Sequence, residues 1–576
     1  MNNKLQGIGA SSGIAIAKAF VIKELNFDLS NQTFTDEKSE LEKYQLWCQK
    51  AKTDIDQIIT IAQSKLKEDK LAIFEAHKQL IDDIEIQTEI KSLIQAKQPA
   101  AVAIQQVYQN YYQIFSNMED QYFKERASDV QDIQKRLLAI ALNLQLPNLL
   151  TINHECIIVA HDLTPSETAQ LDAKFVKGFL NNIGGRTSHA AIMARTLEIP
   201  AVVALKNITE QVENNVVLAM DGTSGVVEII KDETTKNHWL TKKNQYQKYL
   251  ENLAKYQNQD AVTKDGVKVL VEGNIGHDQD VDRVLVNGAS SIGLFRSEFL
   301  YMDSSNWPSE EEQYQSYKKV LEKIPDHLVL IRTLDIGGDK NLKYFEFPKE
   351  MNPFLGYRAL RLSLDLRETF KTQLRALLRA SVHGKLGIMF PMVATLDEFL
   401  LAKQITLDLK TEMIQANIPV GDVQIGMMIE IPTTAVFAHV FSKHADFFSI
   451  GSNDLIQYSF AVDRMSDKVN YLYQPNSPAL LTMIKLAIDG AHANHKMIGM
   501  CGEMAGEVLS VPLLLGLNLD AFSMSASSIP KIKYVISKLN HKECQKLVAH
   551  ALTLETETEV NQLVTQFLID NDIVWY

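Results

Sequence analysis

The sequence is poor in cysteine, in uninterrupted apolar runs and in positive charge. Its four cysteines lie far apart with no CxxC pair, so we expect neither a disulfide framework nor a thiolate zinc site, and the pattern favours the reducing cytoplasm. The apolar stretches 5–17 and 137–153 are interrupted by small or polar residues, so we expect neither a signal peptide nor membrane insertion. With 58 Lys and Arg against 71 Asp and Glu, the net charge of −13 argues against nucleic-acid binding.

The remaining composition is typical of a soluble protein with several domains. Apolar residues make up 46% and charged residues 22% of the 576 residues, and this length predicts roughly three to five domains. Residues 1–20 read as strands and turns. Within 21–146, Gly and Pro are rare and apolar residues recur every three or four positions, which predicts a helical bundle inserted into another domain.

After the bundle, the sequence returns to short β-rich runs. Segments such as CIIVA and VVLAM alternate with turns rich in Gly and Asp, and one helix is predicted to start near Ser188. Residues 147–230 therefore form a small α/β domain together with 1–20. A polar stretch, 231–260, predicts a linking helix.

Eight strand candidates follow between 267 and 526, and helical patterns separate most of them. This order predicts a (β/α)8 TIM barrel over 261–576, so the expected fold class is multidomain α/β. In such barrels the carboxyl ends of the strands form the active-site face. Polar or charged residues end most of the strand candidates: Asn274, Arg296, Asp335, Glu430, Asp454 and Glu503.

The segment GGRTSHAAIMAR, which begins at Gly184, places a histidine where a helix starts. Gly184 and Gly185 let a ligand approach the backbone, and Thr187 or Ser188 can cap the helix that His189 opens. The positive end of the helix dipole favours a neutral imidazole and an anion on its ring. The lone pair of His189 could then attack phosphorus. The alternative is a purely structural histidine.

Several arginines lie at or after the strand ends of the predicted barrel: Arg296, Arg332, Arg358, Arg361 and Arg464. Arginine binds carboxylate and phosphate through two parallel hydrogen bonds. The set therefore suggests a small polyanion as substrate. The alternative is that these arginines form surface salt bridges.

Two further features of the barrel suggest chemistry. Glu430 and Asp454 end neighbouring strands, and two hard carboxylates on one rim suit Mg²⁺, which also binds substrate phosphate and water. Cys501 lies between glycine-rich segments at the end of the seventh strand, and a thiol that stays protonated at neutral pH can deliver a proton to carbon. The alternatives are helix-capping carboxylates and an inert buried cysteine.

One segment imitates a nucleotide-binding motif. GIGASSG, residues 7–13, has the spacing GxGxxxG, and no parallel βαβ pattern follows it. The dinucleotide-binding motif requires GxGxxG in that context. No GxxxxGK[ST] loop is present either, so we do not expect a nucleotide site.

Together these segments resemble enzyme I of the phosphoenolpyruvate:sugar phosphotransferase system, over essentially the whole chain. The matching segments are DLTPSETAQL (162–171), GGRTSHAAIMAR (184–195), GLFRSEFLYM (293–302), RTLDIGGDK (332–340), NPFLGYRALR (352–361), FSIGSNDLIQY (448–458), AVDR (461–464) and MCGEMAG (500–506). Several also resemble pyruvate phosphate dikinase and phosphoenolpyruvate synthase. The helical insert and the lack of a separate ATP-grasp domain are what favour enzyme I.

The resemblance implies specific roles for individual residues. His189 would be phosphorylated through Nε2, and Thr168 would hydrogen-bond the other side of its ring. Glu430 and Asp454 would ligate Mg²⁺, and Cys501 would protonate the enolate. The residues implied to bind phosphoenolpyruvate are Arg296, Arg332, Asn453, Asp454 and Arg464, and we assign Arg358 to the same set.

The resemblance also implies partners. The bundle 21–146 is similar to the docking domain for the carrier protein HPr, and the acidic residues Asp82, Asp83 and Glu85 suit a basic carrier surface. HPr would receive the phosphoryl group as the first step of sugar transport. A homodimer through the barrel is implied as well. Ser12 stands where the family commonly has proline, and Ser452 where it has threonine.

A single histidine cannot occupy the barrel mouth and the docking face at once, so we expect the small α/β domain to swivel about 231–260. One alternative is an ATP-linked dikinase relative, which would form ATP from AMP and pyrophosphate. Another is a regulatory scaffold that binds partners through the bundle and would tolerate changes at Cys501 and Glu430.

Overall fold

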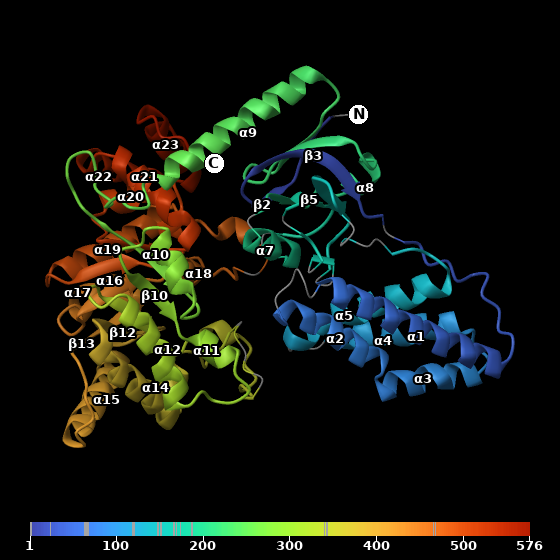
Figure 1. Cartoon of the computed structure of the whole chain (residues 1–576). Helices are drawn as coiled ribbons and strands as arrows, with labels where there is room; N and C mark the ends of the chain where they lie inside the picture. Colours follow the sequence, from blue (N-terminus) through green and yellow to red (C-terminus); the bar gives the residue numbers. More distant parts are fainter. Residues whose placement is uncertain are drawn as a thin grey trace. The chain divides into compact units, whose positions relative to one another are not determined.

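The computed structural model (Figure 1) describes residues 3–576 except 24, 63–67, 118–120, 147–148, 150–151, 165–166, 169, 173, 186–187, 198, 339, 341, 343, 465 and 467. The chain divides into two compact units. The first is Met1–Lys248 together with Tyr576, and the second is Tyr249–Trp575.

The first unit contains an eight-stranded mixed sheet with the order β1-β8-β7-β3-β4-β5-β6-β2. Its strands are β1 (Lys4–Gln6), β2 (Ile8–Ser11), β3 (Ile14–Val21), β4 (Cys156–Ala160), β5 (Val176–Asn181), β6 (Ala201–Val203), β7 (Val217–Asp221) and β8 (Val226–Ile229). Strand β3 pairs in parallel with β4 and antiparallel with β7. The first residues of the chain and the segment after the helices therefore share one sheet.

The helical insert lies between β3 and β4 in the sequence. Its helices are α1 (Glu37–Ala62), α2 (Glu68–Ile81), α3 (Ile84–Gln95), α4 (Ala100–Asn117) and α5 (Gln121–Ala141). They bury an apolar stripe from each helix, including Ile55, Ile90 and Ile104, as the three- to four-residue periodicity predicts. Glu40 of α1 is buried and accepts a hydrogen bond from the backbone N of Ala100 at 2.8 Å, which connects α1 to the start of α4.

Three more helices belong to the segment that ends the first unit: α7 (His189–Thr196), α8 (Ile208–Gln211) and α9 (Glu233–Ala254). The first part of α9 is fixed to the sheet, because Trp239 Nε1 donates to Glu228 at 2.8 Å and Lys242 pairs with Asp221 at 2.7 Å. The boundary between the units falls within α9. The domain limits inferred from the sequence remain predictions, although this boundary lies inside the predicted linker.

The second unit is a closed parallel barrel of eight strands. They are β9 (Leu270–Ile275), β10 (Ile292–Arg296), β11 (Val329–Arg332), β12 (Leu386–Phe390), β13 (Val423–Ile429), β14 (Phe447–Ile450), β15 (Met497–Met500) and β16 (Ala521–Met524). Each overlaps one of the eight predicted strands, so the predicted fold class is confirmed. The core inside the barrel includes Leu294, Met389, Met428 and Phe447.

Helices connect the strands of the barrel and extend beyond the last one. They are α10 (Asp280–Val286), α11 (Glu298–Met302), α12 (Glu310–Lys323), α13 (Leu360–Asp365), α14 (Arg367–Ala380), α15 (Leu396–Gln415), α16 (Pro432–Val436), α17 (Ala438–Phe441), α18 (Ser452–Ser459), α19 (Pro478–His492), α20 (Val511–Gly516), α21 (Ile529–Lys538), α22 (His541–Ala551) and α23 (Glu557–Asp570). Capping boxes at Ser309, Thr395 and Thr556 begin α12, α15 and α23. These caps satisfy backbone donors that the first helical turn leaves unpaired.

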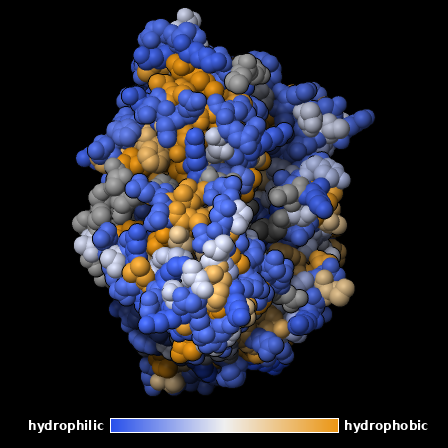
Figure 2. Space-filling model, turned by 90° about the vertical axis from the view of Figure 1, so that its right-hand side faces the viewer, coloured by the Kyte–Doolittle hydropathy of each residue, from blue (hydrophilic) through white to orange (hydrophobic). Residues whose placement is uncertain are grey.

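The surface in Figure 2 mixes hydrophilic residues with smaller hydrophobic groups. Among the helices that the structure describes, none combines the length and the apolar character needed to cross a membrane.

Candidate active site

The first candidate region is the start of helix α7. Ser188 is its N-cap, and the Ser188 hydroxyl accepts a hydrogen bond from the backbone N of Ala191 at 3.4 Å. Gly184 has a φ of +104°, which an L side chain rarely adopts. Of the two expected caps, Ser188 fills the role, and Thr187 lies outside the described residues.

His189 opens α7, as predicted, so its backbone lies in the first helical turn. Its side chain is outside the part of the chain that the structure describes. The helix behind it is firmly packed, since Ala190, Ala191 and Ala194 are buried in the core. Thr168 is fully buried, and the described contacts do not test its predicted bond to the histidine ring.

The second region is a cavity of about 640 Å³ at the carboxyl ends of the barrel strands. Predicted residues that line it are Arg296, Arg332, Glu430, Asn453, Asp454, Arg464 and Cys501. They come from β10 and β11 and from the segments that follow β13, β14 and β15. Closure of the barrel therefore brings together seven residues that the sequence separates widely. Arg358 does not line this cavity.

Arg332 is part of a buried ion network. Its guanidinium donates to Glu298 and pairs with Asp335 at 3.0 Å. Lys340 bridges the same two carboxylates, at 2.9 Å to Glu298 and 2.7 Å to Asp335. Although burial opposes ionisation of these acids, the surrounding cations hold the pKa of Asp335 well below its usual value. The network is therefore ionised and fixed in place.

Arg296 and Arg332 each have a buried Nε that finds no hydrogen-bond partner among the described residues. Burial lowers the pKa of Arg296, and its guanidinium stands 5.1 Å above the ring of Phe299. An unpaired buried donor is costly, so the cavity is suited to an anion that accepts these hydrogen bonds.

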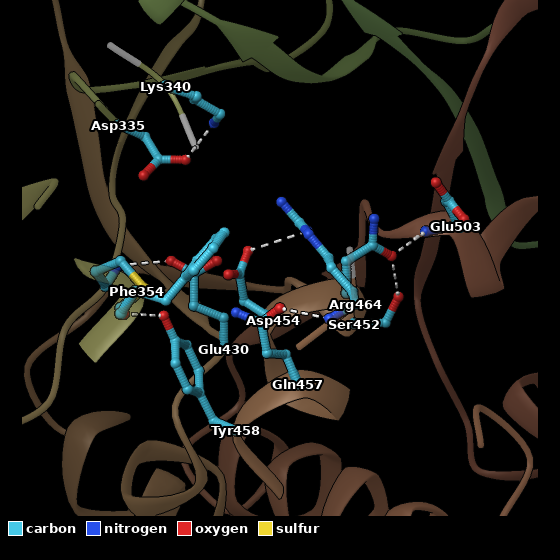
Figure 3. Close-up of polar contacts among 12 residues, drawn as sticks. Asp335, Lys340, Phe354, Glu430, Ser452, Asp454, Gln457, Tyr458, Arg464 and Glu503 are labelled. Atoms are coloured by element: carbon cyan, nitrogen blue, oxygen red, sulfur yellow. Dashed lines mark hydrogen bonds and ion pairs between the residues drawn. The ribbon is translucent and has the colours of Figure 1, made fainter. Parts of the chain in front are cut away.

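Arg358 lies behind the cavity wall and is only 1% exposed. It donates to Asp335 at 3.1 Å, to Asp454 at 3.3 Å and to the Tyr458 hydroxyl at 3.1 Å. Tyr458 in turn donates to the carbonyl oxygen of Phe354, as Figure 3 shows. Arg358 therefore holds the acidic residues of the site, and direct substrate binding by its side chain stays a prediction.

Glu430 and Asp454 place two carboxylates on the same rim. Glu430 is 1% exposed and accepts a hydrogen bond from the backbone N of Met392. Burial and the charges of Asp454 and Asp335 raise the pKa of Glu430 to about 7. Asp454 is 3.9 Å from the Arg464 guanidinium (Figure 3). Repulsion between the two acids favours a cation or a proton between them.

This pair fits Mg²⁺ by its chemistry. Both residues offer hard oxygen ligands, which Mg²⁺ prefers together with water and substrate phosphate. A Cβ at Gly451 would lie 2.7 Å from Glu430 Oε2, so the glycine keeps space open beside that oxygen. Within the described ranges, no group of three or more His, Cys, Asp or Glu is arranged to hold a metal. The protein itself thus offers two carboxylates.

Cys501 directly follows β15 and is buried. Its thiol is 3.8 Å from the carbonyl oxygen of Ile450, and burial raises its pKa to about 11. The thiol is therefore protonated at neutral pH, as predicted from the sequence. Beside it, Asn453 Oδ1 accepts a hydrogen bond from the backbone N of Glu503 at 3.1 Å.

Glu298 and Lys340 have no role predicted from the sequence, and Asp335 is predicted only to be a strand-end residue. All three contact the Arg332 network and line the cavity. A signal was present, because each follows a strand-end arginine within one of the quoted motifs. Their pairing, however, depends on contacts between two strands.

Three family models match the chain, each describing a part of PEP-utilising enzymes. The N-terminal part matches residues 6–126, the mobile domain 152–225, and the PEP-binding domain 250–541. The PEP-binding model thus covers the barrel with every residue of the cavity described above.

Curated relatives match along the full length. A phosphoenolpyruvate-protein phosphotransferase of Mycoplasma capricolum is 52% identical over 575 residues, covering 99% of this chain and 100% of the relative. Proteins of the same name from Staphylococcus epidermidis and Bacillus subtilis are 49% and 47% identical, covering 98% of this chain and 100% and 99% of their own lengths.

Proposed function

Because the chain belongs to the phosphoenolpyruvate-protein phosphotransferase family, we propose that it moves the phosphoryl group of phosphoenolpyruvate to its own His189. The chain is a transferase that uses phosphoenolpyruvate. The observation that carries the site assignment is the pair of arginines Arg296 and Arg332, whose buried Nε donors lack partners among the described residues. They line a cavity at the barrel mouth where a phosphate and a carboxylate would accept those bonds.

In this proposal Arg296, Arg332 and Arg464 neutralise the substrate's negative charge, which would otherwise repel the nucleophile. The side-chain amide of Asn453 and the carboxylate of Asp454 complete the binding surface. Arg358 contributes from behind by holding Asp454. Glu298 and Asp335 keep the Arg332 guanidinium in one orientation, so that little reorganisation accompanies the reaction.

The transfer is an in-line displacement at phosphorus. Nε2 of neutral His189 forms the new bond, the bond between phosphorus and the enol oxygen breaks, and pyruvate enolate leaves. The enolate then takes the proton of the Cys501 thiol at C3, which leaves a thiolate that must recover a proton before the next turnover. Thr168 would orient the imidazole through its other nitrogen. The N-terminal position of His189 on α7 stabilises the phosphorylated ring.

We propose Mg²⁺ as the cofactor, held by Glu430 and Asp454. When bound, it would supply positive charge beside the substrate's oxygens. The donor set, the raised pKa of Glu430 and the open space at Gly451 all support this choice.

The second acceptor would be a histidine of the carrier HPr, docked on the bundle 21–146. Glu85 and Ile84 lie exposed at the start of α3, and Ile84 is 80% exposed. Asp83 is used as the N-cap of this helix, and Asp82 pairs with Lys52 at 2.7 Å. An acidic surface with an exposed apolar residue suits a basic carrier with an apolar contact.

The single His189 must reach both the cavity in the other compact unit and the carrier docked on the bundle, so we propose that the α/β domain, 1–20 with 147–230, moves about the 231–260 linker. The proposal further includes a homodimer through the barrel, 261–576, a cytoplasmic location and a place at the head of a sugar phosphotransferase system. These features come from the family rather than from contacts of the described residues.

The central test is phosphorylation with labelled phosphoenolpyruvate and Mg²⁺. We expect an acid-labile, base-stable phosphoryl group on the wild-type protein and none on His189→Ala. His154→Ala, which changes an exposed histidine in the same domain, serves as the matched control and should label normally. Normal labelling of His189→Ala would show that another residue is the nucleophile.

A further inference from the structure

Asn274, the inward-facing residue near the end of β9, has no role in the reaction as proposed above. It lines the cavity. Its amide nitrogen donates to the carbonyl oxygen of Cys501 at 2.9 Å, across 227 positions of sequence. Its amide oxygen accepts from the Ser523 hydroxyl on β16 at 2.7 Å. Both ends of the amide are therefore used.

The hydrogen bond to Cys501 occurs where regular strand pairing has stopped. Strand β15 ends at Met500, so Cys501 is the first residue beyond it. On one side, the backbone N of Cys501 donates to Ile450 O at 3.1 Å. On the other side, the Asn274 side chain replaces a strand as the hydrogen-bonding neighbour. The peptide that carries the thiol is thus held from both sides.

The segment after Cys501 has little freedom to relax if this support is lost. A Cβ at Gly502 would clash with the Ser452 hydroxyl and would lie 2.6 Å from the Ser452 backbone N. Glu503 is fixed through its backbone N by Asn453 at 3.1 Å. The position of the thiol is therefore set by two contacts. Asn274 holds the peptide of Cys501, and α18 holds the two residues that follow it.

The Cys501 carbonyl oxygen decides which way the Asn274 amide points. A carbonyl oxygen only accepts, so the amide nitrogen must face Cys501. The amide oxygen then accepts from the Ser523 hydroxyl, which holds the amide in that orientation. Beneath this pair, Glu272 lies on the same side of β9, two residues before Asn274. A Cβ at Gly293 would lie 2.6 Å from the Ser523 hydroxyl and would clash with Glu272 Oε2. Glu272 and Ser523 therefore both pack against the backbone of Gly293.

Glu272 is a buried acid next to this array. It is 4% exposed, and burial raises its pKa to about 7.

We propose that Asn274, oriented by Ser523, is a positioning residue that holds the Cys501 thiol against one face of the enolate. This inference rests on the proposed role of Cys501 as proton donor. Its consequence is stereochemical. A held thiol delivers its proton to C3 from one side, whereas a displaced thiol lets the enolate take a proton from water on either side.

The test uses phosphoenolpyruvate that carries deuterium stereospecifically at C3, turned over in tritiated water with the pyruvate trapped at once as lactate. The chirality of the methyl group then reports the face of protonation. We expect Asn274→Ala and Ser523→Ala to lose about half or more of the wild-type chiral excess, while single-turnover phosphorylation of His189 stays within about threefold of wild type. A purely structural defect would lower phosphorylation and leave the remaining product chiral.

Asn287→Ala removes an exposed amide at the end of α10 and should keep full chirality. Ser523→Thr retains the hydroxyl and should restore most of the excess. Unchanged chirality in both alanine variants, or a racemic methyl group from the wild type, would overturn the proposal. Failure of the proposed function is recognised separately, because it appears as labelling of His189→Ala. Should Asn274→Ala fail to fold, Ser523→Ala gives the same decision.

Discussion

Arg358 joins Asp335 to Asp454 with a single guanidinium, at 3.1 Å and 3.3 Å. The two acids follow different strands of the barrel, and each also contacts a cavity-lining cation, Arg332 or Arg464. The arginine is 1% exposed. The geometry of the binding surface therefore depends on a buried residue that does not line the cavity.

Replacing Arg358 should consequently damage stability and activity together. Arg358→Met removes the guanidinium that two buried carboxylates share, so that Asp335 keeps Arg332 and Lys340, and Asp454 keeps, among the described residues, only Arg464 at 3.9 Å. The expected loss is about 3–5 kcal/mol in the free energy of unfolding of the barrel. Urea denaturation followed by circular dichroism measures it. Arg367→Met, at an exposed position on α14, should change stability little, and an equal effect of both variants would contradict this role of Arg358.

Metal binding by the two rim carboxylates can be measured without turnover. Mn²⁺ serves as a spectroscopic substitute for Mg²⁺, and its binding is followed by electron paramagnetic resonance. Glu430→Gln should weaken binding by about tenfold or more, because it removes one of only two protein carboxylates. Glu412→Gln, on the exposed side of α15, should bind as the wild type does. Equal affinities of the two variants would exclude Glu430 as a ligand.

The buried acid Glu272 should make stability depend on pH. Burial raises its pKa from 4.5 to about 7, so the folded state favours the protonated form. The stabilising contribution is complete below pH 4.5 and is lost as the pH rises to about 7. Glu272→Gln cannot ionise, so it should be more stable than the wild type above pH 7, by about 3 kcal/mol. Thermal unfolding of both proteins at about pH 5 and pH 8 gives the comparison. If the wild type and Glu272→Gln lost the same stability between these two pH values, the prediction would be wrong.

Carrier docking is expected to depend on the exposed charge at the start of α3. Glu85→Lys should slow phosphoryl transfer to a basic HPr-type carrier, with a stronger effect at low salt, because the contact is electrostatic. Self-phosphorylation by phosphoenolpyruvate should stay unchanged. Glu155→Lys provides the control, since Glu155 is exposed outside the bundle. If the two variants transferred equally well, the docking face would lie elsewhere.

The fold could be predicted largely from local patterns. Most barrel strands are apolar runs closed by a polar or charged residue, and the helices of the bundle show their periodicity directly. Such patterns survive in the sequence because burial of one face imposes them on neighbouring residues. The N-cap at Ser188 was likewise visible, since capping acts over three or four residues.

The sequence indicated several of the residues that line the cavity, but it did not indicate which of them contact one another. Arg296, Arg332 and Cys501 stand at strand ends that a barrel brings together. Whether an arginine faces the cavity or supports it from behind depends on its partners across strands. Arg358 carries the same sequence signal as Arg332, yet its two terminal guanidinium nitrogens bond Asp335, Asp454 and Tyr458, and its side chain does not line the cavity.

By itself, then, the sequence determined the order of the elements, the closed barrel and the chemical groups at its mouth, because these follow from periodicity and from motifs of adjacent residues. Only the tertiary structure decided that Glu298 and Lys340 fix Arg332, and that Asn274 supports the peptide of Cys501. Those contacts join residues from different strands, and their hydrogen-bond geometry exists only after the barrel has closed.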